Sequence, residues 1–406
     1  MKFHPISDRK LEIIKSVPTP SYVLDEENLI KNLERLKDIQ DRTGAKVLLA
    51  QKCFSTTAMY PLIAKYLHGT VASGLYEAKL AHEEFHETEP SDKVLENHVF
   101  EPAFHSKDMP EIDSICDHII FNSWNQFHKH KEACKNLSIG IRINPECSTQ
   151  CAEHAIYDPC APGSRLGIRS CDMPDVLPPE IEGFHMHTLC EQYVDDLLKT
   201  FKAVEAKFGK YLHQLKWFNL GGGHYIAHDE YEVETLVNFL NYVRETYDLQ
   251  VYLEPGEGIV LNAGYMVTEV MDKVHNGLDI LILDTSAACH FPDVIEGPYL
   301  PPVYGGYEVP NGNALRAALE DMPQHPYVYR LSSMTCLAGD VIGDYTFDVP
   351  YEIGDKLILE DMALYTMVKN NTFNGMPLPD IRVMRADGSV ELIKSFGYED
   401  FKYRLG

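Results

Sequence analysis

The chain has 406 residues, 45% of them hydrophobic, which is enough for a large core and a second domain. Its 36 basic and 61 acidic residues give a formal net charge of −25, which disfavours a surface for nucleic acids or anionic membranes. A cationic substrate suits this charge better. The amino-terminal stretch MKFHPISDRKLEIIK lacks the apolar core of a secretory signal, and no run reaches transmembrane length. We therefore expect a cytoplasmic protein.

Short runs with strand character alternate with stretches of helical spacing between about residues 44 and 255. Apolar residues recur on one helical face in 29–39 and again in 231–245. Eight such βα units predict a (β/α)8 barrel of the TIM type, with a doubly wound open sheet as the competing fold. The eight runs are KVLLA, TVAS, NHVF, HIIF, IGIRI, IEGFHMH, KWFNL and VYLEP.

The pattern changes after Pro255. The runs GYMVTEVMDKV, DILILD, YVYRLSS and KLILE have strand character, and the connections between them are rich in proline and glycine rather than helical. They predict a mainly β second domain. The first twenty or so residues have no evident role in a barrel, so we assign them to that domain. The predicted division is a barrel over 24–262 and a β-rich domain over 1–23 and 263–406.

Unusual polar and glycine residues follow several of the predicted barrel strands. A (β/α)8 barrel builds its site at the carboxyl ends of its strands, so these residues are expected to lie together. A lysine behind an apolar strand either extends to the surface or, when desolvated, forms a Schiff base. The residues, in chain order, are Lys52, Ser73, Arg142, Asn144, His187, Gly221, Gly222, Gly223 and Glu254.

Four of these features suit one cofactor. Three consecutive glycines let backbone N–H groups approach a phosphate, although a tight turn also explains them. Glu254 is either a solvated rim carboxylate or the partner of a protonated ring nitrogen. His185 and His187 lack a clear third metal ligand, so we expect no metal and favour an imidazole stacked on an aromatic ring. With the Schiff-base lysine, these features together specify pyridoxal phosphate.

The chain resembles the alanine-racemase-type (fold III) pyridoxal phosphate decarboxylases, and within them the branch that acts on carboxylated polyamines. The resemblance covers about residues 19 to 376. The motifs that carry it are TPSYVLD, LLAQKCFS, VASGLYEAKLA, YDPCAPGSRLGIR, HMHTLCE, NLGGGH, EPGEG, DTSAACHFPDVIE, TCLAGDVIGDY and TFNGM.

The resemblance implies cofactor contacts from both domains. Lys52 carries the Schiff base, His187 stacks on the pyridine ring, and Glu254 keeps the ring nitrogen protonated. Cys336 is the proton donor to the decarboxylated carbon and comes from the other subunit of a homodimer. The remaining implied contacts are Gly221, Gly222, Gly223 and Tyr365 at the phosphate, with Arg142, Ser73 and Glu77 in support.

Two departures from the related ornithine and diaminopimelate enzymes concern the substrate. Those enzymes have an arginine after EPG where this chain has Glu257, and a glutamate there suits an amine. The ornithine-type enzymes also have an acid after the cysteine, where this chain has Leu337. The residues expected to bind substrate amines are Glu257 and Asp293, followed by Asp340 and Glu296.

The expected reaction is the decarboxylation of carboxynorspermidine and carboxyspermidine to norspermidine and spermidine in polyamine biosynthesis. The alternatives are a diaminopimelate or other basic amino-acid decarboxylase, an amino-acid racemase, and a degenerate homologue or cofactor-binding regulator without activity. Glu257 disfavours the first, and Cys336 stands where racemases use a tyrosine. Retention of both Lys52 and Cys336 disfavours the last. The two polyamine substrates differ by one methylene, a difference worth only about 1–3 kcal/mol in a pocket.

Overall fold

The computed structural model describes residues 6–86, 93–309 and 325–406. The chain divides into two compact units. The barrel unit comprises Lys31–Ile259, and the sheet unit comprises Met1–Ile30 with Val260–Gly406. Residues 1–5 of the predicted β-rich domain lie outside the described residues.

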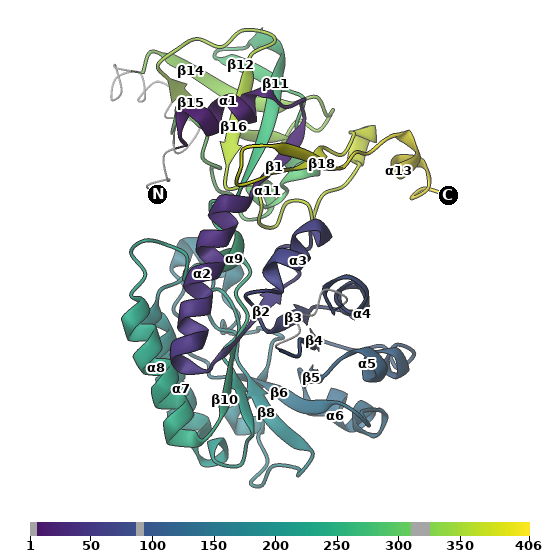
Figure 1. Cartoon of the computed structure of the whole chain (residues 1–406), viewed down its shortest axis with the longest axis vertical. Coiled ribbons are helices and arrows are strands. Elements are labelled where there is room, and N and C mark those ends of the chain that lie inside the picture. Colours follow the sequence, from purple (N-terminus) through teal and green to yellow (C-terminus); the bar gives the residue numbers. More distant parts are fainter. Residues whose placement is uncertain (1–5, 87–92, 310–324) are drawn as a thin grey trace. The chain divides into compact units, whose positions relative to one another are not determined.

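The barrel unit contains a closed barrel of eight parallel strands (Figure 1). The strands pair in the order β5, β4, β3, β2, β10, β9, β8, β6, and pairing of β5 with β6 closes the ring, while the short β7 adds to β6. The predicted barrel is therefore confirmed against the open sheet. The strands are β2 (Lys46–Ala50), β3 (Gly69–Ala72), β4 (Glu96–Glu101), β5 (His118–Phe121), β6 (Ser138–Asn144), β7 (Ile168–Arg169), β8 (Ile181–His185), β9 (Trp217–Asn219) and β10 (Gln250–Leu253).

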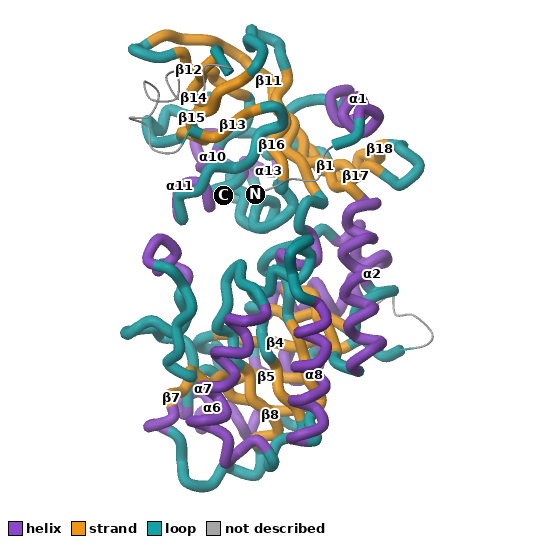
Figure 2. The backbone as a smooth tube through the Cα atoms, turned by 90° about the vertical axis from the view of Figure 1, so that its left-hand side faces the viewer, coloured by secondary structure: helices purple, strands orange, loops and turns teal. Residues whose placement is uncertain are grey.

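Helices surround these strands, as Figure 2 shows for α6, α7 and α8. Both predicted helices are present, and their apolar residues recur on the buried face of each helix. Leu33, Leu36 and Ile39 of α2 are completely buried, as are Leu240 and Val243 of α8. The helices are α2 (Glu26–Thr43), α3 (Tyr60–Ile63), α4 (Leu75–Leu80), α5 (Met109–Ile115), α6 (Trp124–His130), α7 (Val194–Leu212), α8 (Val233–Tyr247) and α9 (Glu257–Val260).

Large aromatic rings fill part of the barrel interior and require glycines opposite them. Trp217 packs with Leu48, Ile120 and Tyr252. A Cβ atom added to Gly183 would lie 2.0 Å from the Trp217 side chain. Glycine is therefore needed here, because a side chain at this position would overlap the Trp217 ring.

The sheet unit is built on a sheet in the order β13, β15, β14, β12, β11, β1, β17, β18, with β16 also paired to β11. Strand β1 runs antiparallel to β11 and parallel to β17, so this amino-terminal strand is part of the sheet. No helix among the described residues is long and apolar enough to cross a membrane. The elements are α1 (Asp8–Ser16), β1 (Ser21–Asp25), β11 (Gly264–His275), β12 (Asp279–Leu283), α10 (Ala287–His290), α11 (Asp293–Glu296), β13 (Gly306–Glu308), β14 (Tyr327–Ser333), β15 (Val341–Phe347), β16 (Lys356–Glu360), β17 (Asp380–Met384), β18 (Val390–Lys394) and α13 (Tyr398–Lys402).

Candidate active site

The predicted site residues of the barrel unit lie at the carboxyl ends of its strands. Because the strands are parallel, these ends form one rim of the barrel. Lys52 follows β2, Ser73 follows β3, Arg142 and Asn144 lie at the end of β6, His187 follows β8, Gly221–Gly223 follow β9, and Glu254 follows β10.

The glycine turn is joined to His187. The backbone N–H of Gly222 donates to Nδ1 of His187 over 3.0 Å, and Nη2 of Arg142 donates to the His187 carbonyl over 3.1 Å. Desolvation by burial, together with the positive charge of Lys52, holds the pKa of His187 well below its usual range. The ring is therefore neutral and can accept a hydrogen bond at Nδ1.

The turn also requires glycine. Gly221 has φ +71° and Gly223 has φ +78°, which side chains rarely tolerate. A Cβ atom on Gly222 would lie 2.3 Å from the Glu254 carbonyl oxygen. The backbone of this turn therefore packs directly on the neighbouring strand end. The Gly221 N–H donates to Oδ1 of Asn219 over 2.9 Å, so the N–H groups of Gly221 and Gly222 both bond to site side chains.

Glu254 is a buried carboxylate held by two donors. Nε2 of His185 lies 3.0 Å from Oε2, and Nδ2 of Asn219 donates to Oε1 over 2.6 Å. Burial alone would raise the pKa of Glu254, but the interactions with His185 and Asn219 outweigh it and lower the pKa. Burial in turn lowers the pKa of His185. The pair thus consists of a neutral imidazole and an anionic carboxylate.

Lys52 is exposed to solvent at the rim, but protein atoms surround its amine and partly desolvate it. Desolvation, and after it the positive charge of Arg142, lowers the pKa of Lys52. This favours the neutral, nucleophilic amine. Nearby, the Ser73 backbone N–H donates to Oε2 of Glu77 over 2.6 Å, and burial raises the pKa of Glu77. Glu257, the first residue of α9, is buried with 8% of its surface exposed.

The predicted site residues of the sheet unit fall into different surroundings. Cys336 is exposed in the loop between β14 and β15, and Tyr365 has a left-handed backbone with φ +48°. Asp293 and Glu296 of α11 both pair with Lys369. Asp340 is buried and accepts hydrogen bonds from its own unit, which are described below.

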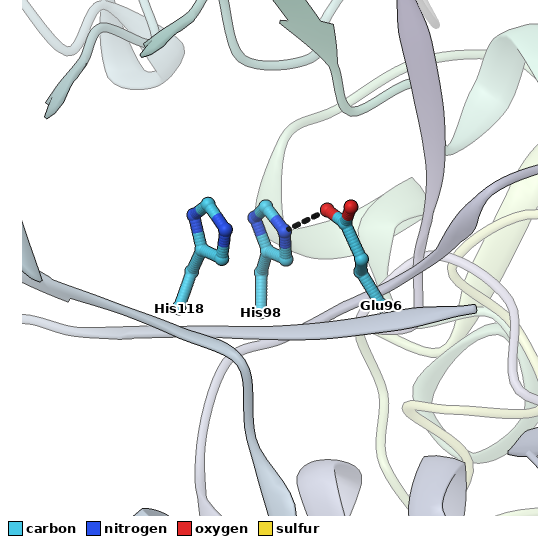
Figure 3. A group of neighbouring side chains, drawn as sticks. All are labelled: Glu96, His98 and His118. Atoms are coloured by element: carbon cyan, nitrogen blue, oxygen red, sulfur yellow. Dashed lines mark hydrogen bonds and ion pairs between the residues drawn. The ribbon is translucent and has the colours of Figure 1, made fainter. Parts of the chain in front are cut away.

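A further polar cluster lies at the opposite, amino-terminal ends of β4 and β5 (Figure 3). One potential ligand atom each from Glu96, His98 and His118 lies within 4.8 Å of the others. However, Glu96 already pairs with Lys46, and the two imidazole rings stack nearly parallel with centroids 4.0 Å apart. Parallel rings do not direct their nitrogen lone pairs at one ion, so we interpret the cluster as packing of the barrel floor.

A family model described as "pyridoxal-dependent decarboxylase, C-terminal sheet domain" matches residues 21–363. The chain belongs to this family of pyridoxal-dependent decarboxylases.

Individual relatives of this decarboxylase cover nearly its whole length. A carboxynorspermidine/carboxyspermidine decarboxylase from Campylobacter jejuni subsp. jejuni is 41% identical over 96% of this chain and 99% of its own. A carboxyaminopropylagmatine decarboxylase from Synechocystis sp. is 38% identical over 97% of both chains. The crystal structure of carboxynorspermidine decarboxylase from Campylobacter jejuni with norspermidine has a TM-score of 0.86 and 39% identity, covering 96% of this chain and 100% of that one.

Pyridoxal phosphate is the cofactor of this decarboxylase family, and the barrel rim has the chemistry to hold it. The buried anion of Glu254 suits a protonated ring nitrogen. The Gly221–Gly223 turn has no Cβ atoms that would keep a phosphate from its backbone, which suits close approach of that group. Lys52 has the lowered pKa that a Schiff-base lysine needs.

Two buried residues of the decarboxylase site had no functional assignment from the sequence. The sequence indicates His185 only as part of a pair with His187, and no motif assigns a role to Asn219. Both act on Glu254, which lies far along the chain. The alternation of strand β8 could have placed His185 inside the barrel, but no sequence pattern indicates its partner.

Proposed function

We propose that the chain decarboxylates carboxynorspermidine and carboxyspermidine, releasing norspermidine and spermidine. The observation that carries the proposal is the 41% identity, over nearly full length, to an enzyme of that activity. Glu257 supports it, because a buried carboxylate at the start of α9 suits an ammonium group better than a carboxylate or phosphate. The net charge of −25 also favours a cationic substrate.

When bound, pyridoxal phosphate supplies an electron sink for the electron pair left behind as CO₂ departs. In our proposal Lys52 holds the cofactor covalently, and the Gly221–Gly223 turn and Tyr365 bind its phosphate. His187 lies against the ring. Glu254, kept anionic by its donors, holds a proton on the ring nitrogen. Arg142, Ser73 and Glu77 support these groups.

The remaining proposed roles belong to the sheet unit and to substrate binding. Cys336 donates a proton to the carbon that has lost its carboxylate. We propose a homodimer in which this thiol comes from the partner subunit. Glu257 and Asp293 are the first candidates for the substrate amines, and Glu296 is the next.

Carboxyaminopropylagmatine is a second candidate substrate, because a relative of that activity is nearly as similar. Its guanidinium end is larger than the ammonium end of the carboxy-polyamines, and a carboxylate such as Glu257 can pair with either. The decisive measurement is kcat/KM for carboxynorspermidine, carboxyspermidine, carboxyaminopropylagmatine and diaminopimelate. We expect at least a tenfold preference for the first two. A preference for either of the others would overturn the substrate assignment.

A further inference from the structure

The loop that carries Cys336 is held at its two ends by one buried carboxylate. It joins β14 to β15, and its tip is exposed. Asp340, with 1% of its surface exposed, accepts hydrogen bonds from the hydroxyls of Ser333 and Thr335 at the start of the loop. It also accepts from the Ser286 hydroxyl over 2.6 Å and from the Ala288 backbone N–H over 3.2 Å.

These contacts explain what the Asp340 carboxylate does in the fold. Its two oxygens receive four donors from within the sheet unit, so its charge is already solvated by the protein. Two donors come from the loop and two from the start of α10, and the carboxylate therefore ties the loop to that helix. This assigns Asp340 to holding the loop rather than to direct contact with a substrate amine.

The middle of the loop has a separate anchor. The backbone N–H of Cys336 donates to Oδ1 of Asn374 over 2.7 Å. Asn374 has φ +61° and ψ +15°, a left-handed conformation that asparagine tolerates better than most residues. It belongs to the TFNGM motif, to which no function is assigned in the sequence analysis.

The segment that presents Asn374 is itself fixed to α10. The Asn371 backbone N–H donates to the Cys289 carbonyl over 2.8 Å, and Nδ2 of Asn371 donates to the Ala288 carbonyl over 2.8 Å. The loop and the TFNGM segment are thus both bonded to the same short helix. Together they fix the backbone of Cys336 from two sides.

We propose that Asn374 is a positioning residue for Cys336, and that Asp340 fixes the loop on which it acts. The proposal rests on the proposed role of Cys336 as proton donor. A proton donor must come within hydrogen-bond reach of the atom that it protonates, and small misplacements of a catalytic group cost much of the rate. The hydrogen bond to Asn374 restricts the Cys336 backbone and so the directions that its thiol can take.

A pair of substitutions isolates this hydrogen bond. Asn374→Gly keeps the left-handed backbone accessible but removes the acceptor, whereas Asn374→Asp keeps an acceptor oxygen. We expect Asn374→Gly to lower kcat about tenfold with KM unchanged, and Asn374→Asp to retain most of the activity. The rate of Cys336 alkylation by iodoacetamide, followed by peptide mass spectrometry, should rise several-fold only in Asn374→Gly, since its loop is less restrained.

Asn262→Gly is the matched control, because Asn262 is another left-handed asparagine of the sheet unit, with φ +56°. It should change neither kcat nor Cys336 alkylation. Thr335→Val, which removes one donor to Asp340, provides a second test if Asn374→Gly does not fold. We expect it to lower kcat in the same way.

The outcomes separate this inference from the proposed function. A wild-type kcat in both Asn374→Gly and Thr335→Val would overturn the inference, provided that Cys336→Ala is inactive. Full activity of Cys336→Ala would instead overturn the proposed role of the thiol. A wild-type protein that decarboxylates none of the substrates would overturn the proposed function itself.

Discussion

Nε2 of His185 lies 3.0 Å from Oε2 of Glu254, and both side chains are almost fully buried inside the barrel. Nδ1 of His185 has no hydrogen-bond partner among the described residues. The imidazole therefore carries its proton on Nε2 and donates it to the carboxylate. This donor helps to keep Glu254 ionised at a buried position, where an unassisted carboxylate would take up a proton.

We predict that His185→Phe lowers kcat by about ten- to a hundredfold, because loss of a hydrogen bond to a charged group costs roughly 1.5–3 kcal/mol. Loss of the donor also raises the pKa of Glu254. Activity should then be lost at a higher pH than in the wild type as the solution is acidified. The measurement is the pH profile of kcat.

His185→Gln is the matched variant, since its amide can still donate to Glu254. It should keep a profile closer to wild type. Identical profiles for His185→Phe and the wild type would exclude His185 as the residue that keeps Glu254 ionised.

Lys52 is predicted to hold the cofactor covalently, since its lowered pKa favours a nucleophilic amine. The wild-type holoenzyme should absorb as a lysine-bound pyridoxal phosphate, and borohydride should fix the cofactor to the peptide that contains Lys52. Lys52→Ala should lose this label. Lys46→Ala, altered at the other end of β2, should keep it. Labelling of Lys52→Ala to the wild-type extent would show that another lysine is responsible.

A shared active site predicts complementation between two inactive variants. Lys52→Ala lacks the proposed Schiff-base lysine of the barrel unit, and Cys336→Ala lacks the proposed proton donor of the sheet unit. If each site takes its lysine from one subunit and its cysteine from the other, a mixed dimer contains one intact site. Mixing equal amounts should restore up to about a quarter of the wild-type activity, because half of the dimers are mixed and each has one working site of two. If subunit exchange is demonstrated and no activity returns, the site is not shared between subunits.

Neutralising the proposed amine-binding carboxylates tests substrate recognition. We expect Glu257→Gln to lower kcat/KM about ten- to a hundredfold while cofactor affinity is unchanged, since a hydrogen bond to a charged group is lost. Asp293→Asn should have a smaller effect, because Asp293 pairs with Lys369, which can remain paired with Glu296. Wild-type kinetics in both variants would remove these residues from the substrate site.

Glu360 has no proposed role in the site, and its burial leads us to predict that the folding stability depends on pH. Burial, with a contribution from the charge of Asp361, raises the pKa of Glu360 to about 7 from an ordinary value of 4.5. The folded chain then binds the proton more tightly than the unfolded chain. The stability that this provides is complete below about pH 4.5 and is lost as the pH rises through about 7.

Glu360→Gln should therefore stabilise the protein at pH 8 by about 1–3 kcal/mol and have little effect near pH 4.5. Denaturant unfolding at the two pH values measures the difference. Glu352→Gln, at a side chain that is 71% exposed, serves as a control with no expected change. Equal stabilisation of Glu360→Gln at both pH values would show that proton uptake is not the cause.

The amino-acid sequence by itself determined the barrel, the mainly β unit and the positions at which the rim residues lie. Alternation between strand and helix periods is a local property, and parallel strands bring their carboxyl ends to one rim whatever their sequence separation. This placed Lys52, His187 and Glu254 on that rim from their positions after strands. It also led to the decarboxylase family, since the motifs around these residues are continuous in the chain.

Only the tertiary structure decided which side chains touch. Contacts across the barrel, such as that between His185 and Glu254, depend on strand stagger and side-chain direction, which leave no mark on local sequence periodicity. The sequence predicts Asp340 together with the other acids as a substrate-binding residue, whereas its burial and four donors are the basis of our proposal that it holds the Cys336 loop. The contact between Asn374 and Cys336 likewise joins segments that no local pattern connects. The packed fold decides the hydrogen-bond partners of buried groups. A polar group without a partner costs free energy only when it is buried, and burial exists only in the folded chain.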